Sequence, residues 1–229
     1  MQTDMTVGKP MKMLLNFTIP VFLGNVFQQL YSMADAVIVG KFVGTKGLAA
    51  VGATGTITFL IIGFLMGVTT GVTVLTSQKF GAGRMDEMRK TVGNAAILSA
   101  VIAVVMTAVS MLGMHRLLVF MHTPEDIFDG AYGYIMIICA GIFTQVLYNL
   151  VSSILRALGN SKTPLYFLIL AAGLNIVLDL VFIIFFHWGA PGAAWATVIS
   201  QGVSGVLCLI YMWKAVPELK MKKEDWYFN

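Results

Sequence analysis

Long runs without a single charged residue are the feature that most constrains this chain. Four of them cover residues 13–34, 47–78, 91–114 and 130–155. A helix rises about 1.5 Å per residue, so about 20 residues cross the ~30 Å hydrocarbon core of a bilayer. Each run is therefore one predicted membrane span.

A fifth stretch, 163–213, carries one charge, Asp179, and is too long for one span. It divides at the turn-forming cluster from His187 to Gly192, which contains Pro191. The sequence thus predicts an all-α polytopic membrane protein whose six transmembrane helices form one lobe over residues 1–213. The predicted spans are 13–36, 48–76, 92–114, 131–155, 165–186 and 192–213. Residues 214–229 are expected to be a basic cytoplasmic tail or a linker between lobes.

The composition excludes several protein classes. Only 11% of the residues are charged and 58% are hydrophobic, whereas about a quarter of a typical soluble domain is charged. The net charge of +4 comes from basic residues that border apolar segments, so we expect no nucleic-acid partner. Cys139 and Cys208 lie in apolar segments without the spacing of metal ligands, so neither a disulfide framework nor a metal centre is expected.

Basic residues are distributed unequally between the two sides of the membrane. Of the 15 Lys and Arg residues, only Lys41, Lys46 and Arg116 fall on one side, and the remaining twelve fall on the other. The positive-inside rule then predicts a multi-pass protein of the plasma (inner) membrane with both termini cytoplasmic. The first apolar stretch is longer than a signal-peptide core and has no small-residue cleavage site, so we expect it to remain as a membrane helix.

Two acidic residues, Asp35 and Asp179, fall inside predicted spans. An ionised carboxylate at the bilayer centre costs roughly 2.5–3.5 kcal/mol, so such residues usually face the protein interior or a wet cavity. Counted from the outer ends of their helices, the two lie ~9 and ~12 Å deep, at a common level. The alternative is that each reaches the membrane interface from near a helix end.

Three more oxygen-bearing side chains fall in the same layer. Asn175 precedes Asp179 by one helical turn, and Thr197 and Tyr134 also enter from the outer side. Burial favours the neutral form of a carboxylic acid, so the acidic pair can take up and release protons. Sodium also prefers oxygen ligands. We predict a proton- or sodium-binding site on these five residues, with no other cofactor, and the sequence leaves the ion open.

Polar residues on three helices recur at helical spacing. In lipid such a stripe turns inward, where it either lines a hydrated cavity or forms hydrogen bonds between helices. Three stripes and the acidic pair favour a cavity that a substrate can enter. Its predicted lining residues are Asn25, Gln28, Ser32, Gln145, Tyr148, Asn149, Ser152, Ser200 and Gln201. Pro20 removes a backbone hydrogen bond from the first helix and is the predicted hinge, although a static kink is an equal alternative.

These residues resemble the amino-terminal half of the multidrug and toxic compound extrusion (MATE) family. The resemblance is carried by Pro20, by Met33 to Ala36, by the loops 78–83 and 156–164, and by Asn175 to Asp179. It implies a cation site on Asp35, Asn175, Asp179 and Thr197, with Tyr134 beside them. It also implies two six-helix lobes, so the expected partner is a missing second lobe or a second copy of this chain. The basic tail favours the first.

The function that this resemblance implies is a cation-coupled antiporter that exports amphipathic, often cationic, organic compounds and drugs through the lipid membrane, without a catalytic residue. One alternative is a flippase for lipid-linked precursors, which is disfavoured because no Lys or Arg falls inside a predicted span. A less favoured alternative is an intramembrane aspartyl protease with Asp35 and Asp179 as its dyad. Such proteases carry a Gly-x-Gly-Asp pattern, whereas Asp179 follows Ile176, Val177 and Leu178.

Overall fold

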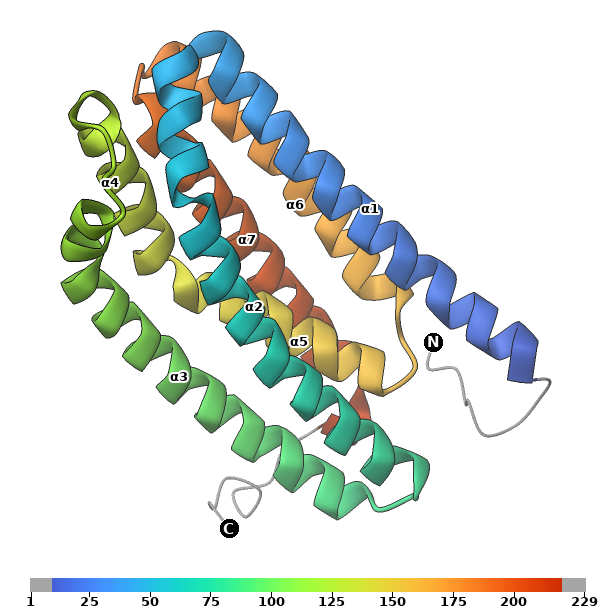
Figure 1. The fold of residues 1–229 in the computed structure, drawn as a ribbon. Helices are drawn as coiled ribbons and strands as arrows, with labels where there is room; N and C mark the ends of the chain where they lie inside the picture. Colours follow the sequence, from blue (N-terminus) through green and yellow to red (C-terminus); the bar gives the residue numbers. More distant parts are fainter. Residues whose placement is uncertain (1–9, 220–229) are drawn as a thin grey trace.

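The structure, a computed structural model, describes residues 10–219 and is helical almost throughout (Figure 1). Its helices are α1 (Pro10–Phe42), α2 (Thr45–Gly81), α3 (Met85–Phe120), α4 (Glu125–Ala140), α5 (Ile142–Ala157), α6 (Lys162–Leu180) and α7 (Gly189–Ala215). A π-helical turn, η1 (Val181–Phe185), continues α6, and a 3-10 turn, η2 (Pro217–Leu219), follows α7. No strand occurs among residues 10–219, so the predicted all-α class is confirmed.

Six membrane crossings fit the helices. Five segments are each long and apolar enough to cross a bilayer, and α4 with α5 makes a sixth, bent by 47°. In five of the six crossings the helices begin before and end after the predicted spans, and the crossing made by α6 and η1 ends one residue early. The difference arises because uncharged runs mark the hydrocarbon core, whereas the helices continue into the polar interface.

The fourth predicted span, 131–155, is not one continuous helix. It breaks at Gly141, where a Cβ atom would lie 2.2 Å from Cγ2 of Val198 on α7. The hydroxyl of Thr144 donates to the Gly141 carbonyl at 2.8 Å, and Thr107 on α3 donates to the Cys139 carbonyl at 3.3 Å. These bonds satisfy carbonyl groups at the break, as a bilayer requires.

Helix α7 lies at the centre of the bundle. It packs against α4, α5 and α6, while α1 lies along α6 at one side and α3 at the other (Figure 1). Only 6% of the apolar window of α1 is buried in the bundle, against 44% for α7. Helix α1 therefore contacts the lobe mainly through α6 and keeps most of its surface uncovered.

Most of the basic residues in the described part of the chain lie in helix ends and a loop at one end of the bundle, which we call the basic end. It holds the start of α1, the loops 82–84 and 158–161, and the end of α7 (Figure 1). Of the predicted tail 214–229, Lys214 and Ala215 complete α7, Pro217–Leu219 form η2, and 220–229 lie outside the described residues.

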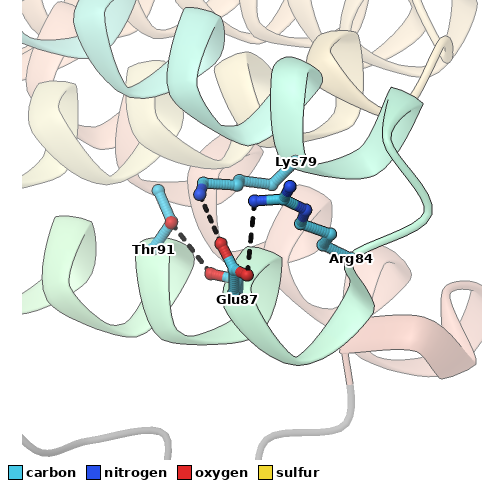
Figure 2. A network of polar contacts seen from close by, with 4 residues as sticks. All are labelled: Lys79, Arg84, Glu87 and Thr91. Atoms are coloured by element: carbon cyan, nitrogen blue, oxygen red, sulfur yellow. Dashed lines mark hydrogen bonds and ion pairs between the residues drawn. The ribbon is translucent and has the colours of Figure 1, made fainter.

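An ionic cluster fixes the turn between α2 and α3 at the basic end (Figure 2). The carboxylate of Glu87 pairs with Lys79 and, at 3.6 Å, with Arg84. The hydroxyl of Thr91 donates to the Glu87 carbonyl at 2.9 Å, as Ser and Thr often do in membrane helices. The last turn of α2 is thereby joined to the first turn of α3.

Candidate functional site

The carboxyl groups of Asp35 on α1 and Asp179 on α6 meet inside the bundle. Asp35 is 8% exposed and Asp179 is 0% exposed. Because α1 packs along α6, the two groups interact directly. One oxygen of each, Oδ1, is buried without a hydrogen-bond partner among the described residues. The site therefore presents two acidic oxygens that are free to bind a proton or a cation.

Asn175 supports Asp179 from the preceding turn of α6 and is fully buried. Its amide is oriented by its hydrogen-bonding partners. In that orientation its nitrogen donates to Oδ2 of Asp179 at 3.1 Å, and its oxygen accepts from the backbone N–H of Thr197 at 3.3 Å. The carboxyl group of Asp179 is thus held in one orientation and connected to α7.

Two tyrosines complete the site. The hydroxyl of Tyr31 on α1 donates to Oγ1 of Thr197 at 3.1 Å. Tyr134 on α4 is 7% exposed, and its hydroxyl lies within electrostatic range of both acids and of Tyr31. The structure thus brings together all five residues that the sequence placed in one layer.

Tyr31 is a site residue that the sequence analysis missed. It precedes Asp35 by four positions, so it lies on the same face of α1 one turn away. That spacing is the signal that identifies it, and it is the same spacing that relates Asn175 to Asp179. Tyr31 supplies the direct contact of α1 with Thr197.

Among residues 10–219, no ion pair joins a basic side chain to either acid. The four ion pairs among the described residues involve Lys46, Lys79, Arg84 and Arg89, none of which pairs with Asp35 or Asp179. Burial and the neighbouring carboxyl act on each acid, and the Asn175 amide donates to Asp179. Two buried carboxylates are costly to ionise together without a cation between them.

The π-helical turn η1 begins two residues after Asp179. The N–H of Phe186 donates to the Val181 carbonyl at 3.1 Å, five residues back, and that of Trp188 to the Phe182 carbonyl at 3.0 Å. Such turns insert one residue into a helix and occur often beside functional sites. The start of α7 packs closely on this turn, since a Cβ at Gly192 would lie 3.3 Å from Cβ of Phe182.

Several of the predicted cavity residues line one cleft between α1, α5 and α6, with a volume of about 60 Å³. They are Asn25, Gln28, Tyr148 and Asn149, and the predicted hinge Pro20 lines the same cleft. Within the cleft, the hydroxyl of Tyr148 donates to the Pro164 carbonyl at 3.0 Å and so connects α5 to α6. Pro20 is buried within a continuous α1, beside this cleft.

The other predicted cavity residues lie elsewhere. Gln145 and Gln201 line a much smaller void of about 10 Å³, together with Thr197. Ser152 and Ser200 are buried, and Ser200 donates to the Thr197 carbonyl of its own helix at 3.0 Å. Ser32 is exposed and bonds the Gln28 carbonyl. For Ser32 and Ser200, the structure shows hydrogen bonding within one helix.

Comparisons with a family model, with related sequences and with solved structures all point to the same family of proteins. The family model MatE matches residues 20–181. The chain is 33% identical over 92% of its length to the probable multidrug resistance protein YpnP of Bacillus subtilis, of which it covers 47%. It is also similar to two solved structures, described as MATE in the bent and in the straight conformation, each with a TM-score of 0.89 and 28% identity. The matched region covers 97% of this chain in both comparisons, and it covers 50% and 49% of the two solved chains, respectively. It therefore spans about half the length of the proteins it matches.

Proposed function

The chain belongs to the MATE family of multidrug transporters, and from this premise we propose that it forms the amino-terminal lobe of a cation-coupled antiporter. The exported compounds are amphipathic organic molecules, often cationic, and the coupling ion is a proton or sodium. Asp35 and Asp179 bind that ion, with Asn175, Thr197, Tyr134 and Tyr31 around them.

One observation carries this proposal: two interacting carboxyl groups are buried in a membrane lobe, and in the part of the chain that the structure describes neither forms an ion pair with a basic side chain. Charge balance in such a site comes from protons or from a bound cation. Coupling follows if the lobe adopts two conformations that bind the ion unequally. The ion then shifts the population toward the conformation that holds it more tightly.

Helix α1 is well placed to transmit this shift. Its outer part carries Asp35 and Tyr31, and its inner part carries Pro20 and the cleft residues Asn25 and Gln28. Proline interrupts the backbone bonding of a helix and permits bending. Two similar solved structures are described as MATE in the bent and in the straight conformation, which supports two conformations for the proposed transporter as well.

Transport by the whole protein requires more than this lobe. Because the chain covers about half of its relatives, the substrate pathway is completed by a second six-helix lobe or by a second copy of the chain. Both termini of this lobe face the cytoplasm of the plasma membrane in the proposal. No observation favours a lipid flippase over drug export, and membership of a transporter family leaves the protease alternative without support.

Efflux measured on the protein encoded by its complete gene tests the proposal. Asp35→Asn and Asp179→Asn are each expected to abolish efflux driven by an imposed proton or sodium gradient, at unchanged membrane abundance. Asp129→Asn, at an exposed position near the start of α4, is the matched control and should transport normally. Wild-type efflux from both site variants would refute the coupling role.

A further inference from the structure

A cavity of about 410 Å³ lies at the basic end, where the first turns of α6 meet the start of α1 and the end of α7. It shares only Ser161 with the cleft that Pro20 and Arg156 line. Sites for small molecules usually have volumes of about 300–1,000 Å³. The cavity is therefore a second candidate site, separate from both the cleft and the acidic pair.

The amino-terminal end of α6 forms one wall of this cavity. The first N–H groups of an α-helix have no partner within the helix and carry a partial positive charge. Here Oδ1 of Asn160 accepts from the N–H of Thr163 at 3.1 Å, and Pro164 has no N–H. The N–H of Lys162 makes no hydrogen bond with another described residue. A helix end of this kind attracts an anion.

Ser161 provides separate evidence for a ligand. It occupies the N-cap position of α6, is 6% exposed and lines the cavity. Serine at an N-cap usually accepts from an N–H of the first turn, but the Ser161 hydroxyl makes neither this bond nor any other within residues 10–219. Asn160 is 7% exposed, and its amide nitrogen also lacks a partner in the described part of the chain. Because an unpaired buried polar group is costly, we expect both side chains to bond a group inside the cavity.

Lys162 supplies a full positive charge. Among the described residues it is the only charged side chain that lines the cavity, and it forms no ion pair with any of them. An ammonium group binds phosphate as a point charge, without the planar geometry that a guanidinium requires. The ammonium group, the Ser161 hydroxyl and the Asn160 amide can donate to different oxygens of one phosphate. No carboxylate lines the described walls to repel it.

The remaining walls suit a lipid better than a free phosphate. Residues Lys162–Phe185 form a segment long and apolar enough to cross a bilayer, so its first turn lies near the level of the headgroups. Tyr166 and Tyr211 line the cavity there, as aromatic residues with a polar tip do at membrane interfaces. Met13 and Phe17 add apolar surface from α1. The glycerol and first methylene groups of a phospholipid would cover this surface, whereas inorganic phosphate would leave it in water.

We propose that this cavity binds the phosphate of an anionic membrane phospholipid, phosphatidylglycerol, which then connects the starts of α1 and α6 with the end of α7. The lipid is a bound partner and not a transported compound, so the inference does not depend on the coupling ion or on the substrate. Since α1 packs mainly on α6, a lipid that contacts three helices should also stabilise the lobe.

Native mass spectrometry of the full protein measures the binding of phosphatidylglycerol and of phosphatidylcholine with the same acyl chains. Lys162→Gln is expected to weaken phosphatidylglycerol binding by about fivefold and phosphatidylcholine binding by less than about twofold, because choline balances the phosphate charge. Lys162→Arg keeps the charge and should retain binding. Ser161→Ala should weaken phosphatidylglycerol binding by about threefold. It should leave the melting temperature without lipid unchanged, since the hydroxyl caps no N–H.

Lys90→Gln is the matched control. It removes one charge at an exposed position of α3, at the same end of the bundle but outside the cavity. Equal weakening by Lys90→Gln and Lys162→Gln would mean that the lipid responds to the charge of the whole end, which overturns the inference. Unchanged lipid binding in Lys162→Gln and Ser161→Ala overturns it as well.

Inorganic phosphate forms the third arm of the experiment. If it binds the wild type as tightly as phosphatidylglycerol does, and loses affinity in Lys162→Gln, the occupant is a free phosphate and the lipid inference is wrong. A lower melting temperature of lipid-free Ser161→Ala would assign this hydroxyl a structural role and count against the inference. Each of these outcomes leaves the proposed function intact, because the Asp35 and Asp179 variants test coupling independently.

Discussion

The hydroxyl of Tyr31 donates to Oγ1 of Thr197 at 3.1 Å, across 166 positions of the chain. This bond joins α1 to α7 beside the buried carboxyls of Asp35 and Asp179. Helix α1 otherwise packs mainly on α6, so the bond is one of the few side-chain ties between α1 and the centre of the lobe. A change in the proposed cation site and a change in the position of α1 are therefore mechanically linked.

Replacing Tyr31 with Phe tests that link. A neutral hydrogen bond contributes about 0.5–1.5 kcal/mol, so Tyr31→Phe should raise the cation concentration for half-maximal efflux by roughly twofold to tenfold. The control is Tyr132→Phe, because the ring of Tyr132 packs against His115 and Phe128, and Phe retains that packing. An unchanged cation dependence in Tyr31→Phe would show that the bond does not contribute to the site.

Asn175→Leu should destabilise the lobe. Leucine has a similar volume but leaves Oδ2 of Asp179 without its amide donor. An unpaired buried group of this kind costs about 1–3 kcal/mol. Unfolding monitored by circular dichroism in detergent measures the loss. Asn16→Leu, on the exposed face of α1, should change stability by less than about 0.5 kcal/mol, and an equal effect of the two substitutions would contradict the role of Asn175.

Gly141→Ala should lower the stability of the lobe because the added methyl group would clash with helix α7. The added Cβ would lie 2.2 Å from Cγ2 of Val198, and such overpacking costs about 1–3 kcal/mol. Val198→Ala removes the clashing methyl groups, so the double variant should recover at least about 1 kcal/mol relative to additivity. At Gly173 an added Cβ meets nothing within 4 Å, and Gly173→Ala should be neutral or slightly stabilising. If the changes in stability caused by the two substitutions simply add in the double variant, the break between α4 and α5 does not depend on the contact of Gly141 with Val198.

Pro20→Ala should stabilise the lobe and slow transport at the same time. Alanine restores a backbone donor inside α1 and is better than proline in a helix interior by up to about 3 kcal/mol. If bending at Pro20 is part of the cycle, the efflux rate falls several-fold while cation binding at equilibrium is unchanged. Pro191→Ala is the control because Pro191 lies in the first turn of α7, where proline is tolerated. If the Pro20→Ala protein is more stable but transports at the normal rate, Pro20 is a static kink and not a hinge.

The sequence predicts much of the candidate site because depth in a membrane helix is a one-dimensional quantity. Counting residues from the outer ends of the spans placed Asp35 and Asp179 at one level, and the four-residue spacing placed Asn175 beside Asp179; the fold brings these side chains together. The same reasoning overlooked Tyr31, whose importance depends on Thr197 from a distant helix. The polar stripes predicted the cavity-lining residues less reliably. Periodicity alone does not distinguish Gln28, which lines the cleft, from Ser200, which donates a hydrogen bond within its own helix.

By itself the sequence determined that this chain crosses a membrane as a bundle of helices with two acids held in the interior, because apolar length and the cost of a buried charge are local properties. Only the tertiary structure decided where the fourth crossing breaks, since that follows from the approach of Val198 to Gly141. It also decided that Arg156 faces a cleft, which depends on how α1, α5 and α6 pack around its side chain. Contacts between distant helices are set by packing in three dimensions, and the pattern of neighbouring residues in the sequence does not predict them.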